Sequence, residues 1–305
     1  MTKTTVIAAV DRFPEDDAVL LRGIEVAGRH QTTLRIVHVA DVPDYAASAA
    51  VMGPRIARAK TSAQQRIDAA LGRLGIAPDA VDVRLEVGDP ADRLVALSQQ
   101  MAPAVMVMRA RHQPWIAQKL FGSVTERVIA AGVASVLVVK PEVTRPYGRV
   151  LAAVEGADTA DAALSDAMAA VPGVDIEVVH AVAVEPRLEQ AMLRVGSPLT
   201  EITAHLEALV QDAERRLALR AQAWSPGVTW RVLRGDPAQQ LVHATRADGV
   251  DLIALGPHRS GMLTRIFSGS VIQQLIRDAA CDVLIGPAPA PAPVQDNASR
   301  AEIVA

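Results

Sequence analysis

Short runs of apolar residues alternate along the chain with longer stretches of helical spacing, and this succession occurs twice. Such runs, bounded by polar and turn-forming residues, are typical of buried strands. In the first half, strands are predicted at residues 6–10, 34–39, 81–87, 105–108 and 136–139. In the second half, they are predicted at 150–154, 176–182, 228–233, 252–255 and 283–285. Residues 81–87 alternate with a period of two, which indicates a strand at a sheet edge.

The stretches between the strands carry helix signals. After Pro14-Glu15-Asp16-Asp17, an acidic helix start, the apolar residues Val19, Leu20, Ile24 and Ala27 follow helical spacing. Residues 56–74 are also predicted to be helical. Gly88-Asp89-Pro90 predicts a turn into a further helix, with Asp89 as N-cap and Pro90 at the first helical position.

The motifs at these turns are repeated. Gly88-Asp89-Pro90 returns as Gly235-Asp236-Pro237, and Gly122-Ser123 returns as Gly269-Ser270, in each case 147 residues later. A repeat of this length is a duplicated domain. We therefore expect one domain at residues 1–142, a second at 147–287 and a disordered tail at 288–305, where proline and alanine alternate. The proline-bounded join is short, so the domains are expected to pack closely.

Strands that alternate with helices predict the α/β class. Right-handed crossovers give each half a doubly wound, Rossmann-like domain with a five-stranded parallel sheet. Ligands of such sheets bind beyond the carboxyl ends of the strands, where the strand order reverses, here between the first and fourth strands.

Composition narrows the class of protein. Half of the residues are apolar but 3% are aromatic, so the cores are expected to consist of aliphatic side chains. The net charge of −3 provides no basic surface for nucleic acid. No apolar run has the length of a membrane span, and Met1–Thr5 does not resemble a signal peptide. A cytoplasmic protein without membrane or nucleic-acid partners is expected.

The second copy carries the richer candidate site. Its fourth strand runs into Gly256, His258, Arg259 and Gly261, and Gly269-Ser270 opens the last helix. Glycines at a strand exit let the backbone approach a ligand, and a helix N-terminus after a capping serine favours an anion such as phosphate. The alternative interpretation is a glycine turn followed by an ordinary N-cap.

These residues resemble the signature of the universal stress protein family. The matching motifs are Asp251-Leu252-Ile253, Gly256, His258 and Gly269-Ser270, together with the Gly-x-Pro turns of both copies. The chain without its tail looks like two UspA-type domains in tandem. In similar proteins the last strands pair antiparallel, which implies an intrachain pseudo-dimer with residues 136–139 facing 283–285.

Members of the family divide into ATP-binding and non-binding types. The resemblance implies a site for ATP or another adenine nucleotide in the second domain. Its candidate residues are Glu155, Ala181, Leu255, Gly256, His258, Arg259, Gly261, Gly269, Ser270 and Val271. Two positions depart from the binding pattern: Arg259 replaces a glycine, and Glu155 replaces an aspartate. A guanidinium at Arg259 either obstructs the loop or pairs with phosphate oxygens.

The first copy keeps Asp11, Val39 and Gly122-Ser123 but lacks the early loop glycines. Arg109 stands at the strand exit and is expected to obstruct backbone wrapping, so no nucleotide is expected there. Arg109, Arg111 and His112 form either an anion-receiving cluster or a solvated loop.

The remaining candidates favour structure over chemistry. His38 and His180 occupy matching strand ends and are predicted to be core or crevice-wall residues, and Cys281 is predicted to be buried. No catalytic or metal-binding motif is present in the sequence.

The leading hypothesis is a stress-response sensor or regulator that binds adenine nucleotide and is at most a weak ATPase, with Ser270 and His258 nearest the phosphates. A scaffold that binds protein partners but no nucleotide is the alternative, and a related nucleotide-binding enzyme is a third. A homodimer of chains remains open.

Overall fold

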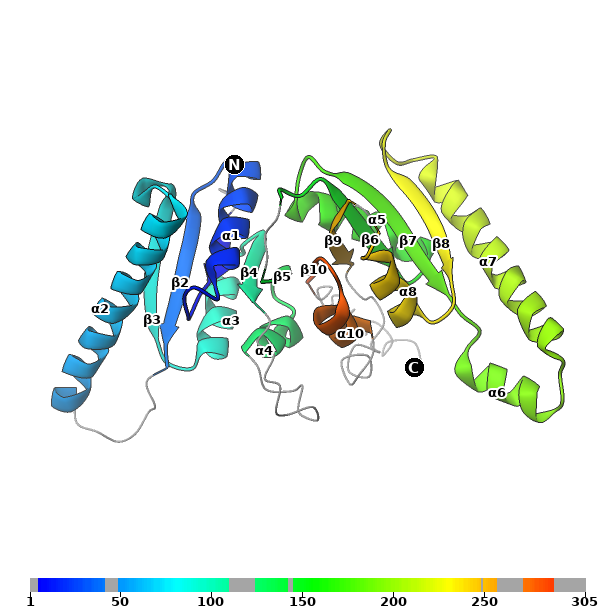
Figure 1. Cartoon of the computed structure of the whole chain (residues 1–305), viewed down its shortest axis with the longest axis horizontal. Helices are drawn as coiled ribbons and strands as arrows, with labels where there is room; N and C mark the ends of the chain where they lie inside the picture. Colours follow the sequence, from blue (N-terminus) through cyan, green and yellow to red (C-terminus); the bar gives the residue numbers. More distant parts are fainter. Residues whose placement is uncertain are drawn as a thin grey trace, which may run out of the picture.

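The computed structural model describes residues 5–41, 49–109, 124–141, 145–247, 249–256 and 271–287. In these residues one continuous ten-stranded sheet runs through the molecule, with helices on both faces (Figure 1). The predicted tail and residues 110–123 and 257–270 lie outside the described residues.

The two halves have the same succession of elements. The first half contains β1 (Val6–Ala9), α1 (Asp17–Arg29), β2 (Leu34–Ala40), α2 (Ala49–Leu74), β3 (Val81–Val87), α3 (Pro90–Met101), β4 (Val105–Arg109), α4 (Val124–Ala131) and β5 (Val136–Val139). The second half contains β6 (Arg149–Val154), α5 (Ala157–Ala170), β7 (Asp175–Val182), α6 (Pro186–Arg194), α7 (Leu199–Ala221), β8 (Thr229–Arg234), α8 (Pro237–Ala244), β9 (Val250–Leu255), α10 (Val271–Asp278) and β10 (Asp282–Ile285).

The strand order is β3-β2-β1-β4-β5-β10-β9-β6-β7-β8. All neighbours are parallel except β5 and β10, which pair antiparallel with Val136 opposite Ile285 and Val138 opposite Val283. The α/β class, the doubly wound halves and this antiparallel pairing are confirmed. β3 lies at an edge of the sheet, as its alternating pattern predicted.

Two aliphatic cores lie on opposite faces of the sheet. One contains residues from α1, α2, α5 and α7, and the other contains residues from α3, α4, α8 and α10. Successive residues of a strand, such as Val6 and Ile7, belong to different cores because strand side chains alternate between faces. Each core extends across both halves, so the halves bury apolar surface together.

The helix starts follow the capping rules. Asp89 accepts a hydrogen bond from the Asp92 backbone N–H at 2.9 Å, and Asp236 accepts one from Gln239 at 3.0 Å. The prediction for α2 was too short, because the helix begins at Ala49 and continues through Pro54. Proline interrupts one backbone hydrogen bond, and the sequence pattern was read as starting after it. The short helix α6 was not predicted.

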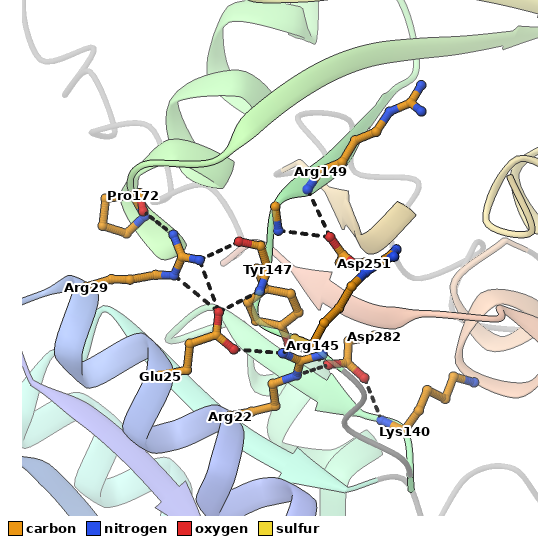
Figure 2. A network of polar contacts seen from close by, with 11 residues as sticks. Arg22, Glu25, Arg29, Lys140, Arg145, Tyr147, Arg149, Pro172, Asp251 and Asp282 are labelled. Atoms are coloured by element: carbon orange, nitrogen blue, oxygen red, sulfur yellow. Dashed lines mark hydrogen bonds and ion pairs between the residues drawn. The ribbon is translucent and has the colours of Figure 1, made fainter. Parts of the chain in front are cut away.

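Buried charges join the two halves at the amino ends of β9 and β10 (Figure 2). Arg22 of α1 is 4% exposed, and its Nε donates to Asp282 Oδ2 at 2.8 Å. Its guanidinium lies 3.9 Å from the centroid of the Tyr147 ring, and the Tyr147 hydroxyl donates to the same Asp282 oxygen at 2.5 Å. A cation, a carboxylate and a phenol from three separate segments therefore meet one another's charge and hydrogen-bonding requirements inside the molecule.

A second layer of contacts holds the chain where it enters the second half. Glu25 accepts hydrogen bonds from Arg22 and from the Tyr147 backbone N–H, at 2.7 and 2.6 Å (Figure 2). Asp251 accepts from the backbone N–H groups of Gly148 and Arg149, at 2.9 and 3.0 Å. Backbone and charge contacts therefore fix the start of β6 between α1 and β9.

Replacing Arg22 with methionine should strongly destabilise the protein. The change leaves the buried Asp282 carboxylate without its cation, and breaking a buried pair in this way costs about 3–5 kcal/mol. The measurement is the free energy of unfolding in urea, followed by circular dichroism.

Arg127→Met is the control, since Arg127 pairs with Asp89 and Asp92 on the exposed surface. Its effect should stay within about 1 kcal/mol. Equal costs for the two variants would contradict the role assigned to Arg22.

Candidate functional site

The strand order produces two equivalent crevices at the carboxyl edge of the sheet. One lies where β1 and β4 are neighbours, and the other lies where β6 and β9 are neighbours. Helices connect away from these strands in opposite directions, which leaves the strand ends accessible to a ligand. In the second half, Ala153 pairs with Leu255 at this edge.

The structure places five of the predicted site residues. Glu155 is exposed and directly follows β6, while Leu255 is the last residue of β9 and is 4% exposed. Gly256 follows Leu255, and Ala181 lies inside β7, one residue before its end. Val271 is the first residue of α10. The ends of β6, β7 and β9 thus bring Glu155, Ala181 and Gly256 to one edge of the sheet.

The other five predicted site residues lie outside the described part of the chain. They are His258, Arg259, Gly261, Gly269 and Ser270. Arg111 and His112 of the first copy also lie there. Roles for these residues remain predictions from the sequence.

Gly256 has a steric reason to be glycine. A Cβ added at this position would lie 2.5 Å from Cβ and 2.9 Å from Cα of Ala163 on α5. Real side chains do not approach so closely, so the exit of β9 touches α5 through two small residues. The family motif glycine therefore serves helix packing, whatever it contributes to a ligand.

The first crevice is filled by an ion pair. Arg109, at the end of β4, donates from Nε to Asp16 Oδ1 at 2.8 Å. Asp16 is 5% exposed, and its other oxygen accepts from the backbone N–H groups of Asp11 and Arg12 at 2.7 and 2.9 Å. The carboxylate thus organises the turn after β1 and holds the arginine across the crevice.

The second crevice has small residues at the corresponding places. Arg73 pairs with Asp17 in the first half, and Arg220 pairs with Asp161 in the second, which aligns α1 with α5. Counting back one residue from each aspartate, Asp16 corresponds to Ala160. The strand registers likewise align Arg109 with Gly256. The sequence pattern identified the obstruction by Arg109 but treated Asp16 only as a helix-start residue, so its partnership with Arg109 was missed.

The two matched histidines bind the strand ends together. Nδ1 of His38 donates to the Val10 carbonyl oxygen at 3.0 Å, and Nδ1 of His180 donates to that of Val154 at 3.0 Å. Both histidines therefore tie neighbouring strands together at the carboxyl edge of the sheet. Burial lowers the pKa of His38, and the nearby Arg66 cation lowers it further.

Cys281 is buried, as expected, and burial raises the pKa of its thiol to about 12, so it is not a reactive thiolate at neutral pH. Among the described residues, no three His, Cys, Asp or Glu side chains gather as a metal site. No helix in the same part of the chain is long and apolar enough to cross a membrane.

Two doubly wound halves joined through their last strands define a tandem α/β protein, with an ion pair across the first crevice and Gly256 and Ala160 at the corresponding positions of the second. The profile of the universal stress protein family matches residues 3–140 and again residues 146–287. The chain therefore belongs to the universal stress protein family, and it contains two copies of the family's domain.

The chain is also similar to individual proteins and solved structures. A universal stress protein of Thermus aquaticus, named for its place in the QAH/OAS sulfhydrylase 3′ region, is 32% identical over 145 residues, which cover 46% of this chain and 98% of the relative. The crystal structure of a universal stress protein from Archaeoglobus fulgidus has a TM-score of 0.60 at 15% identity, covering 94% of this chain and 97% of its own. A universal stress protein crystallised in complex with cAMP is 23% identical over 47% of this chain and all of its own, with a TM-score of 0.35.

Gly256→Ala should destabilise the protein by about 1–3 kcal/mol, because the new methyl group overlaps the backbone of α5. Urea unfolding measures the loss. In Gly256→Ala/Ala163→Gly, removal of the opposing methyl should restore part of it.

Gly72→Ala is the matched control, since a Cβ at this position of α2 meets nothing within 4 Å. It should stabilise the protein by about 0.5–1 kcal/mol through helix propensity. A Gly256→Ala variant as stable as this control would refute the close packing.

Acidification should destabilise the first half through His38. Its lowered pKa in the folded state means that the unfolded chain takes up the proton first as the pH falls below about 6.5. The free energy of unfolding should then fall by up to about 1.4 kcal/mol per pH unit. Arg66 and Asp16, which face His38, act in opposite directions on its charge.

The measurement is urea unfolding between about pH 7.5 and about pH 5, a range that includes the ordinary histidine pKa of about 6.5. His38→Gln keeps a donor for the Val10 carbonyl but does not titrate. Its pH dependence should be shallower, and parallel curves for the two proteins would exclude His38 as the titrating group.

Proposed function

We propose that this protein binds an adenine nucleotide, such as ATP, in its second domain and acts as a sensor or regulator in a stress response. The observation that carries the proposal is the contrast between the crevices. Arg109 and Asp16 fill the first, while Gly256 and Ala160 occupy the corresponding positions in the second. Space for a ligand is therefore expected in the second domain and not in the first.

The residues at the second crevice suit the parts of a nucleotide. Glu155, which directly follows β6, is expected to accept hydrogen bonds from a ribose, and Ala181 is expected to contact the base. Gly256 leads into the loop that carries His258, Arg259 and Gly261. Gly269 and Ser270 precede α10, whose first backbone N–H groups have no partner within the helix and attract phosphate.

Binding without turnover is the mode of action that these residues favour. Within the described residues, His180 lies near the end of β7, and its Nδ1 is engaged with the Val154 carbonyl. Of the predicted phosphate contacts, the backbone amides, the Ser270 hydroxyl and the Arg259 guanidinium bind and orient without accepting a proton at neutral pH, so a weak ATPase activity would depend on His258. Occupancy of the site, read by partner proteins, is then the signal.

A scaffold that binds proteins but no nucleotide is the second candidate. Gly256 favours it, because the close approach of Ala163 explains this glycine without any ligand. Arg259, in place of a loop glycine, acts in the same direction.

Equilibrium titration with a fluorescent ATP analogue tests the proposal. The wild type should give saturable binding with about one site per chain, because the proposal assigns a nucleotide to the second domain alone. Gly269→Trp should abolish the signal by placing an indole where the phosphates are expected.

Gly122→Trp, the same substitution at the repeated position in the first domain, is the control and should bind normally. Equal loss in both variants would contradict a site confined to the second domain. Absence of binding in the wild type would leave the scaffold.

A further inference from the structure

Lys140 extends from the first domain onto the helix that begins at the proposed phosphate site. It follows β5 directly, and its Nζ donates to the Ile276 carbonyl oxygen of α10 at 2.7 Å. Its backbone N–H donates to Asp282 Oδ1 at 2.8 Å, on the strand after α10 (Figure 2). One residue of the first domain is thus bound to both the end of α10 and the start of β10.

These contacts act on the carboxyl end of α10. The last carbonyl groups of a helix have no partner inside it, and a cation there also interacts favourably with the helix dipole. The described part of α10 runs from Val271 to Asp278, so Ile276 is less than two helical turns from Val271. Lys140 holds the carboxyl end, and the residues expected to contact phosphate lie just before the amino end.

The junction of buried charges strengthens this attachment. Asp282 binds Lys140 and, through its other oxygen, Arg22 and Tyr147. Half-burial lowers the pKa of Lys140, with Asp282 and Asp278 acting in the opposite direction. The end of α10 is therefore fixed to groups that also determine how the two domains meet.

The first domain has no equivalent arrangement at α4. By the sequence repeat, Lys140 corresponds to Pro287, which has no side-chain donor, and Asp282 corresponds to Ser135. The attachment runs in one direction, from the first domain to the helix of the second. That helix belongs to the domain for which nucleotide binding is proposed.

We propose that Lys140 is a positioning residue that couples the domain junction to the nucleotide site. This inference rests on the proposed function of the second domain. Nucleotide bound at the start of α10 should tighten the contact of Lys140 with Ile276, and loss of that contact should weaken nucleotide binding. By linkage, the two effects must be equal in free energy.

The first test compares Lys140→Met and Lys140→Arg with the wild type. Lys140→Met removes the donor and the charge, so it should weaken binding of the fluorescent ATP analogue about two- to fivefold. Hydrogen exchange of the α10 amides, measured without nucleotide, should become faster. Lys140→Arg keeps a cationic donor, so its nucleotide binding and its exchange rates should match those of the wild type. A role of Lys140 in packing alone would not predict this match.

Lys60→Met is the matched control, because Lys60 lies on α2, which packs on β2 and β3 at the outer edge of the sheet, whereas α10 lies near its middle (Figure 1). It should change neither binding nor exchange.

The second test uses the wild-type protein and therefore does not depend on how a variant folds. The chain has four lysines, Lys3, Lys60, Lys119 and Lys140. Acetic anhydride labels free amines, and mass spectrometry resolves the four sites. ATP should slow the labelling of Lys140 relative to Lys60.

The outcomes separate this inference from the function on which it rests. Slower labelling with ATP and faster α10 exchange in Lys140→Met support the coupling. Nucleotide binding that is equal in the wild type and Lys140→Met, with unchanged labelling, would overturn the coupling and leave the proposed function intact. A wild type that binds no nucleotide would overturn both, even if α10 exchange changes in Lys140→Met.

Discussion

The antiparallel pairing of β5 with β10 is the constraint on which the rest of the structure depends. Each half alone would end in an apolar strand with unpaired backbone groups, and an exposed edge of this kind needs a partner. Joining the two edges makes one ten-stranded sheet and lets both aliphatic cores extend across the domain boundary. The pairing also brings Lys140 next to Asp282, so the charges of the junction can meet.

The duplication gave two crevices with different chemistry. In the first, Arg109 and Asp16 satisfy each other, so the strand exit needs no ligand to neutralise its charge. In the second, Gly256 follows β9 directly and packs against α5, and it carries no side chain at the position that Arg109 occupies in the first. The buried carboxylates Asp251 and Asp282 belong to the second half, where they accept donors from the junction. The two related domains therefore differ in the chemistry of their crevices, and the second supplies the buried carboxylates of the junction.

Much of the fold could be predicted from local patterns. The repeat, the strand runs and the caps at Asp89 and Asp236 depend on residues close in sequence, and the structure agrees with them. For the candidate site, the resemblance supplied the residue set, and the sheet order accounts for the edge shared by Glu155, Ala181 and Gly256. The pattern did not reveal why Gly256 is glycine, because Ala163 lies far from it in the sequence. Asp251, identified as part of a family motif, proved to anchor the start of β6.

The sequence by itself determined the α/β class, the duplication and the strands, because periodicity and turn chemistry act over a few neighbouring residues. It also indicated the difference between the two loops, since glycine and arginine differ in bulk wherever they stand. Only the tertiary structure decided which charges are neutralised. Arg22 pairs with Asp282, Arg109 pairs with Asp16, and Lys140 binds the carboxyl end of α10. These partners are up to 260 residues apart in the sequence. Such partners depend on which strands become neighbours, and sheet order brings them together over any distance in the chain.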